Sequence, residues 1–163
     1  MSKTLIAYFS ASGATARAAK EMADATGADL YEIRPAQPYS PGDLDWRDKK
    51  SRSTLEMNDP ACRPAIDGQV NGMEQYDTIL IGFPIWWYVE PRIVDTFLDS
   101  YDFSGKTLIP FATSGGSGMG RTEEILKKSC PTKAVFLPGR RFDSGASLAA
   151  IRNWLNALEL SKK

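Results

Sequence analysis

The chain alternates short apolar runs with longer stretches in which apolar residues recur at helical spacing. Short runs with few polar positions are typical of strands buried in a parallel sheet. We expect five strands, and only the second alternates between apolar and polar positions: residues 3–9, 30–33, 77–83, 107–112 and 133–137. Pro110 is unfavourable inside a central strand, because proline cannot donate a ladder hydrogen bond.

Amphipathic stretches follow the first, third, fourth and fifth strands, and the last of them is the final element predicted. We expect these stretches to be helices: residues 15–25, 91–98, 123–128 and 148–158. Strands that alternate with helices indicate a parallel sheet with helices on both faces. The length of 163 residues is typical of one domain, so we expect residues 1–163 to form a single α/β domain.

The pattern weakens between residues 35 and 76, where prolines and polar residues dominate. Residues 44–57 are apolar enough for a surface helix at most, and Asn58-Asp59-Pro60 would end it. We assign no task to this segment from the sequence.

The first loop, residues 10–15, joins the first strand to the first helix. Free amides at a helix N-terminus, together with hydroxyl groups, suit a phosphate, and a glycine lets the backbone approach it closely. The candidate ligands of this loop are Ser10, Ser12, Gly13, Ala14 and Thr15. The alternative is a capping turn that binds nothing. The loop lacks the Gly-Lys-Ser/Thr motif of a nucleoside triphosphate site and the Gly-x-Gly-x-x-Gly motif of a dinucleotide site.

The second loop, residues 84–88, follows the third strand and carries three consecutive aromatic residues. Neighbouring side chains point in different directions, so three such rings are hard to bury in one core. We expect this loop to hold a flat ligand through Pro84, Ile85, Trp86, Trp87 and Tyr88. The alternative is an apolar plug or a patch that contacts a partner protein.

The third loop, residues 113–118, follows the fourth strand and is rich in glycine and hydroxyl groups. Its amides and hydroxyls can bond the polar edge of a ring system. The candidate residues are Thr113, Ser114, Gly115, Gly116 and Gly118. A glycine-rich turn with no ligand is the alternative.

All three loops follow strands, so in a doubly wound sheet they meet at the edge where ligands bind. A phosphate site, aromatic faces and a glycine-rich rim together fit a mononucleotide with a large flat head. Flavin fits this description best.

The segment 6–15, Ile-Ala-Tyr-Phe-Ser-Ala-Ser-Gly-Ala-Thr, resembles the phosphate-loop signature of flavodoxins and flavodoxin-like FMN proteins, and the similarity extends over nearly the whole chain. The resemblance implies a three-layer doubly wound fold with strand order 2-1-3-4-5. It also implies FMN, with the phosphate on residues 10–15 and the isoalloxazine ring between the second and third loops.

Two positions depart from the family pattern. Ala14 stands where the family usually has Asn, so we expect FMN binding to be weaker by about 1 kcal/mol, the value of one ordinary hydrogen bond. The second loop lacks the usual glycine whose peptide turns toward the flavin. The usual stabilisation of the one-electron form is therefore not implied for this chain.

Composition narrows the function further. Lys+Arg and Asp+Glu both number 20, so the formal net charge is zero and nothing indicates a nucleic-acid partner. No run approaches the length of a membrane span, and no secretory signal is evident, so we expect a cytoplasmic protein. We expect Cys62 and Cys130 to be free thiols, and the chain has no histidine, the commonest general base.

We therefore expect a small electron carrier that docks on a redox partner protein. The first alternative is an FMN-dependent oxidoreductase that passes electrons from NAD(P)H to a quinone-like acceptor. The second is a flavin-free protein-binding module on the same fold. We expect a monomer or a weak homodimer.

Overall fold

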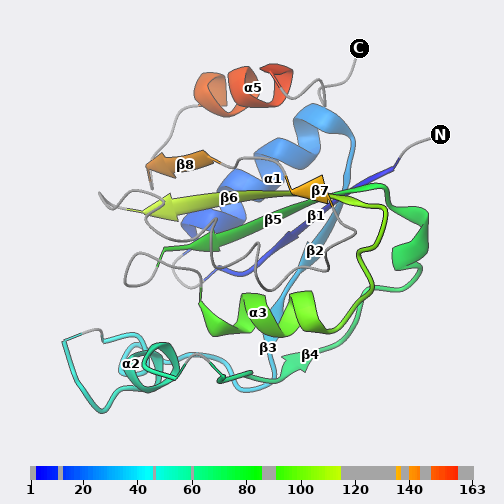
Figure 1. Ribbon diagram of the computed structural model, residues 1–163. Coiled ribbons are helices and arrows are strands. Elements are labelled where there is room, and N and C mark those ends of the chain that lie inside the picture. The colour runs from blue at the N-terminus through cyan, green and yellow to red at the C-terminus, as the bar shows by residue number, and fades with distance from the viewer. Residues whose placement is uncertain are drawn as a thin grey trace.

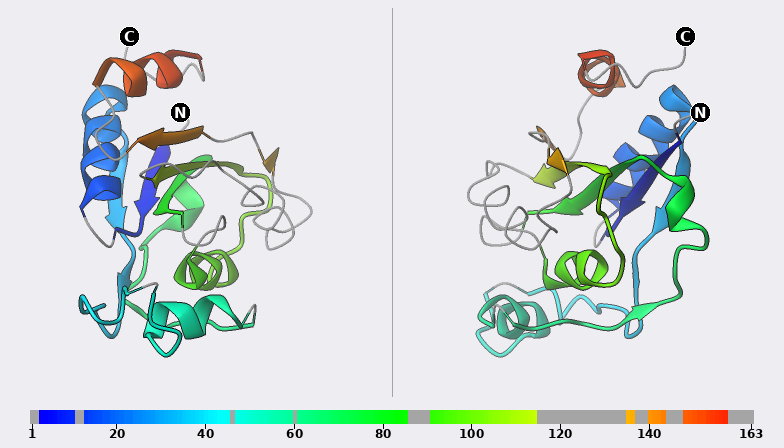
Figure 2. Two further views of the ribbon diagram at one scale, coloured as in Figure 1. Left: turned by 90° about the vertical axis from the view of Figure 1, so that its left-hand side faces the viewer. Right: turned by 45° about the vertical axis from the view of Figure 1, so that its right-hand side comes forward.

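The computed structural model describes residues 3–10, 13–45, 47–59, 61–85, 91–114, 135–136, 140–143 and 148–157. A twisted sheet forms the middle layer, with α1 (Ala14–Thr26) and α5 (Leu148–Ala157) on one face (Figure 1). The helix α3 (Arg92–Asp99) covers the opposite face, and both further views show the same three layers (Figure 2). The prediction of an α/β sheet with helices on both faces is confirmed.

In the described part of the chain the main sheet has six strands, and every pairing within it is parallel. Its strands are β1 (Thr4–Tyr8), β2 (Asp29–Glu32), β5 (Thr78–Pro84), β6 (Thr107–Ser114), β7 (Val135–Phe136) and β8 (Arg140–Asp143). They lie in the order β2-β1-β5-β6-β7, which confirms the predicted order 2-1-3-4-5.

The fifth strand position differs from the prediction. Of the strand expected at 133–137, the structure describes only Val135 and Phe136, which form β7 and pair with Thr107 and Leu108. A second piece that the sequence did not predict, β8, pairs with residues 111–114 of the same strand β6. The charged start of β8, Arg140-Arg141, conceals it, because an edge strand needs fewer apolar residues than a central one.

This division also explains how Pro110 is accommodated. The amide of Thr107 donates to the carbonyl of Asp77 at 2.8 Å, toward β5. Backbone groups alternate sides along a strand, so the nitrogen of Pro110 faces the other side. There it falls between the residues of β6 that pair with β7 and those that pair with β8. Among the residues that the structure describes, proline therefore removes no ladder hydrogen bond at this position.

The first helix begins and ends at glycines. Gly13 precedes it with φ 97°, and Gly27 follows it with φ 74°, its amide bonded to the carbonyl of Ala23 at 2.8 Å. The left-handed Gly27 confirms the predicted end of this helix. The helix predicted over 123–128 lies outside the described residues.

The segment without a predicted task forms a second, smaller layer beside α3. This layer contains β3 (Arg34–Pro35), α2 (Arg52–Met57) and β4 (Ile66–Asp67), with β3 and β4 paired antiparallel, and the 3-10 turn η1 (Met73–Gln75) then leads back to β5. The helix α2 is shorter than the predicted 44–57, because Ser51 caps its start by accepting a hydrogen bond from the amide of Thr54.

Two apolar clusters fill the spaces on either side of the sheet. Successive residues of β1 separate between them, so that Leu5 and Ala7 face α3 while Ile6 and Tyr8 face α1. Large buried side chains complete each cluster, with Phe83, Phe97 and Phe103 on the α3 side and Met22, Phe111 and Trp154 on the other. Both faces of β1 and β5 are buried, which is why these strands are apolar throughout.

Gly82 permits the closest approach in the core. A Cβ atom at Gly82 would lie 2.1 Å from Cζ of Phe111, a separation that side-chain carbons do not reach. Phe111 is fully buried, so its ring has little space into which it can move. The fifth residue of β5, which pairs with Phe111 of β6, therefore has to lack a side chain.

Gly82→Ala is expected to lower the free energy of unfolding by about 1–3 kcal/mol, the usual cost of overpacking a filled core. Urea denaturation measures this difference. Gly42→Ala is the matched control, since its nearest neighbour would be Ser40 Oγ at 3.8 Å, and it should change stability by no more than about 1 kcal/mol. Equal effects at both positions would contradict the packing argument.

Candidate functional site

The first, second and third loops begin at the ends of three adjacent strands. β5 lies between β1 and β6, and all three run in the same direction. Their arrowheads point toward the same edge of the sheet in Figure 1. The described residues of the three loops therefore lie at one edge, as expected from the strand order.

Thr113 connects the three segments. Its carbonyl accepts a hydrogen bond of 3.0 Å from the amide of Ile85, in the second loop. Its hydroxyl lies 2.7 Å from the hydroxyl of Thr15, at the start of α1. The two threonine side chains are 1% and 3% exposed, so this contact between the first and third loops is shielded from water.

The described part of the first loop leaves the start of α1 open. Ser10 Oγ accepts a hydrogen bond of 3.1 Å from the amide of Gly13, which turns the chain back on itself. A Cβ atom at Gly13 would have no heavy atom within 4 Å, so the space beside this residue is open. Among the described residues, no side chain caps this helix and no acidic residue lies in its first turn. The positive end of the helix is thus available to an anion.

The structure describes eight of the predicted site residues. Ser10, Gly13, Ala14 and Thr15 lie at the end of β1 and the start of α1, while Pro84, Ile85, Thr113 and Ser114 lie at the ends of β5 and β6. The others lie outside the described residues, namely Ser12, Trp86, Trp87, Tyr88, Gly115, Gly116 and Gly118. Their placement at the site stays a prediction.

One anchoring residue, which holds the chain where α3 begins beyond the second loop, was not predicted from the sequence. Arg92, the first residue of α3, is 7% exposed. Its guanidinium donates to the carbonyl of Met57 at 2.9 Å and to that of Glu56 at 3.4 Å, and it lies 3.7 Å from the carboxylate of Asp95. The start of α3 is therefore attached to the end of α2, a contact between distant parts of the chain that no local pattern indicates.

Glu56 in turn organises the segment before it. The hydroxyl of Tyr39 donates to Glu56 Oε1 at 2.5 Å, and Arg52 Nε lies 2.9 Å from Glu56 Oε2. The guanidinium of Arg52 also stacks over the ring of Tyr39 at 3.9 Å. Burial and, after it, the hydrogen bond to Glu56 raise the pKa of Tyr39 well above its usual value. Tyr39 therefore remains a neutral donor at physiological pH.

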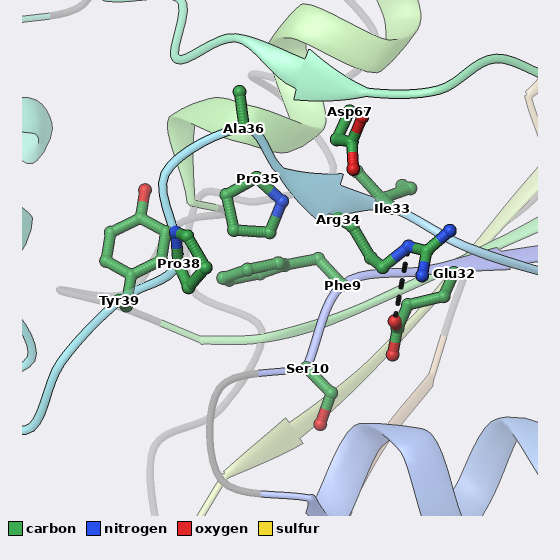
Figure 3. A pocket seen from close by; sticks show the side chains of 10 residues that line it. All are labelled: Phe9, Ser10, Glu32, Ile33, Arg34, Pro35, Ala36, Pro38, Tyr39 and Asp67. Atoms are coloured by element: carbon green, nitrogen blue, oxygen red, sulfur yellow. Dashed lines mark ion pairs between the residues drawn. The ribbon is translucent and has the colours of Figure 1, made fainter.

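A cavity of about 350 Å³ opens beside the first loop, and the sequence analysis did not anticipate it (Figure 3). Its walls combine apolar rings with charged groups from the ends of β1 and β2 and from β3 and β4. The residues that line it are Phe9, Ser10, Glu32, Ile33, Arg34, Pro35, Ala36, Pro38, Tyr39 and Asp67. In the sequence, prolines indicate only a loop, so they did not predict that Pro35 and Pro38 share one wall of a cavity.

None of the described helices has the length and apolar content of a membrane-spanning segment. No group of three or more acidic, cysteine or histidine side chains in the described part of the chain lies close enough to hold a metal ion.

The buried hydroxyl pair makes a testable contribution. Thr15→Val or Thr113→Val alone should lower the free energy of unfolding by about 1–3 kcal/mol, because the remaining hydroxyl would be buried without its partner. The double variant should cost less than the sum of the two, since both partners are then apolar and similar in shape. A double-mutant cycle in urea measures this coupling.

Thr78→Val serves as the control for that cycle, because Thr78 is half-buried at the opposite end of β5. It should show no coupling to Thr113→Val. Additive losses at Thr15 and Thr113 would contradict the role assigned to their contact.

Comparison with known proteins gives a consistent result. The profile of the family described as flavodoxin matches residues 3–158. A structure from Bacteroides eggerthii, assigned as a flavoprotein, is 48% identical with TM-score 0.91 and covers 99% of this chain and 100% of its own. A second structure assigned as a flavoprotein, from Bacteroides uniformis, is 49% identical with TM-score 0.90 and covers 95% of this chain and 98% of its own.

A more distant structure shares the fold. It is a flavoprotein from Lactobacillus acidophilus in complex with FMN, 24% identical with TM-score 0.69, and it covers 86% of this chain and 93% of its own. The search of curated proteins found no match. Because the family profile spans nearly the entire chain and the strand order is the one that the family resemblance implied, this chain belongs to the flavodoxin family.

Proposed function

We propose that this protein binds FMN at the shared edge of β1, β5 and β6 and acts as a small electron carrier. The observation that carries the proposal is Thr113, whose carbonyl and hydroxyl bond the second and first loops at once. Membership of the flavodoxin family supports FMN as the cofactor, as does the FMN complex of the related Lactobacillus flavoprotein. FMN supplies reversible one- or two-electron chemistry, which the protein's own side chains lack.

The described residues of the first loop fit the phosphate of FMN. The uncapped start of α1 offers amides and the positive end of the helix dipole, and Gly13 leaves open space where a side chain would otherwise project. Ser10 holds the turn through the amide of Gly13. Ser12, between them, is expected to add a hydroxyl.

Thr15 contributes through the direction of its hydrogen bond. Either hydroxyl of the Thr15–Thr113 pair can be the donor. When Thr113 donates, Thr15 keeps its own proton for a phosphate oxygen, and the buried pair aligns that donor before the anion arrives. Thr113 then supports the phosphate site from β6 without contacting the anion itself.

The second and third loops are expected to hold the flavin ring. Pro84 and Ile85 are half-buried where β5 ends, so the aromatic residues that follow start from a fixed position. The attachment of Arg92 to α2 fixes the chain on the other side of this loop, where α3 begins. A ring site whose two ends are anchored loses less conformational entropy when it binds a ligand.

Electron transfer to a partner protein suits this chain better than a chemical step at a bound substrate. The sequence contains no histidine, so the commonest side chain for proton transfer near neutral pH is absent. The zero net charge favours docking by local complementarity over long-range attraction to a basic partner. The oxidoreductase and the flavin-free module remain the competing functions, and the following experiments separate all three.

FMN titration of the apoprotein, followed by flavin fluorescence, is expected to show tight binding and a flavin absorbance spectrum. Ser12→Ala and Thr15→Ala should each weaken FMN binding by about tenfold, the usual value of a hydrogen bond to a charged group. Riboflavin, which has no phosphate, should bind both variants as it binds the unmodified protein. Thr26→Ala, at the far end of α1, is the matched control.

A preparation without flavin absorbance that also fails to bind added FMN would refute the cofactor and support the protein-binding module. Equal losses for FMN and riboflavin would show that the phosphate lies elsewhere.

Stopped-flow mixing of the FMN-loaded protein with NADPH tests the carrier directly. A carrier should be reduced only slowly by NADPH alone and rapidly once a separate flavodoxin reductase is added. Rapid bleaching of the flavin absorbance by NADPH without that reductase would instead establish the oxidoreductase.

A further inference from the structure

The cavity beside the first loop has a defined place along the edge that binds the cofactor. The sheet order β2-β1-β5-β6 puts the ring loops at the ends of β5 and β6 and the phosphate loop at the end of β1. The cavity lies beyond them, at the ends of β1 and β2. It therefore lies on the side of the phosphate loop that faces away from the predicted ring site.

Ser10 belongs to both sites. It lines the cavity, and its Oγ accepts the hydrogen bond from Gly13 that shapes the first loop. Figure 3 shows Ser10 at the border of the cavity nearest to α1. A group attached to a phosphate on the first loop can thus enter the cavity without crossing another element.

The apolar wall of the cavity is rigid. Phe9 is 1% exposed, so it supports the wall from behind, where it packs edge-to-face on Tyr39 with ring centroids 5.7 Å apart; Pro35, Pro38 and Tyr39 form the accessible surface. Pro35 and Pro38 lie beside Phe9 in Figure 3, and proline rings have few conformations to lose. Tyr39 is itself held by Glu56. A preformed wall of rings suits a flat base, and the volume of about 350 Å³ lies within the range of small-molecule sites.

The opposite side of the cavity carries charge. Asp67 presents a carboxylate, which accepts hydrogen bonds and therefore suits an amino group on the base, while Glu32 pairs with Arg34. Arg34 lies between the two carboxylates in Figure 3. Its Nε is 3.8 Å from Glu32 Oε1 and its side chain is 66% exposed, so the guanidinium is only weakly held and can turn toward a phosphate.

From this arrangement we propose that the cavity binds an adenosine phosphate, with the adenine against the ring wall, its amino group toward Asp67, and its phosphate toward Ser10 and Arg34. The inference rests on the phosphate position in the proposed function. Two molecules would bring this group to the cavity. One is FAD bound in place of FMN, and the other is NADH lying alongside bound FMN.

Calorimetric titration of the apoprotein with AMP tests the proposal. Pro38→Trp fills the cavity, whereas Gln37→Trp places the same side chain one residue earlier, at a position that does not line it. AMP should bind the unmodified protein and Gln37→Trp equally and Pro38→Trp at least about tenfold more weakly, a conservative value for one stacked base. IMP, with a carbonyl in place of the amino group, should bind the unmodified protein about tenfold more weakly than AMP.

FMN affinity, measured in the same three proteins, separates this inference from the proposed function. It should be equal in all three, and a failure of the unmodified protein to bind FMN would refute the proposed function whatever AMP does. Absence of AMP binding, or equal AMP binding in Pro38→Trp and Gln37→Trp, would overturn the adenosine site. FAD titrated into the apoprotein and NADH titrated into the FMN-loaded protein then identify the source, as the dinucleotide whose affinity Pro38→Trp lowers.

Discussion

The parallel pairing of β5 with β1 on one side and β6 on the other is the constraint on which the molecule depends. It buries both faces of the central strands, and it brings three chain segments that are far apart in sequence to one edge. Thr113 then converts this proximity into contact, because its main chain and side chain bond different neighbours. The site is thus a direct product of the sheet, and anything that disturbed the register of β5 against β6 would separate its loops.

The fold was largely predictable because its strands are buried on both sides. Apolar runs such as 3–9 and 77–83 have no other simple interpretation between amphipathic helices. The edge was harder to predict, since β8 begins with two arginines and its pairing partner is a strand more than twenty residues away. Pro110 weakened the prediction of a central strand, yet its nitrogen lies between the residues of β6 that pair with β7 and those that pair with β8.

The site was predictable where chemistry is local and not where it depends on long-range packing. Hydroxyls next to a helix start identified Ser10 and Thr15 from the sequence, and both lie where the three strands end. The bond between Thr15 and Thr113 joins residues 98 positions apart, and the contacts of Arg92 reach across 35 and 36 positions. Such contacts have no periodicity or spacing of their own, so the task of the segment between β2 and β5 became visible only in three dimensions.

Phe111 and Gly82 also limit which substitutions a protein of this design accepts. Because the phenyl ring occupies the space of a missing methyl group, neither position can change independently. A larger residue at 82 requires a smaller one at 111, and a smaller residue at 111 alone leaves a void against a bare strand. An engineer who wished to alter the sheet beneath the cofactor edge would therefore have to treat the two residues as a single unit of design.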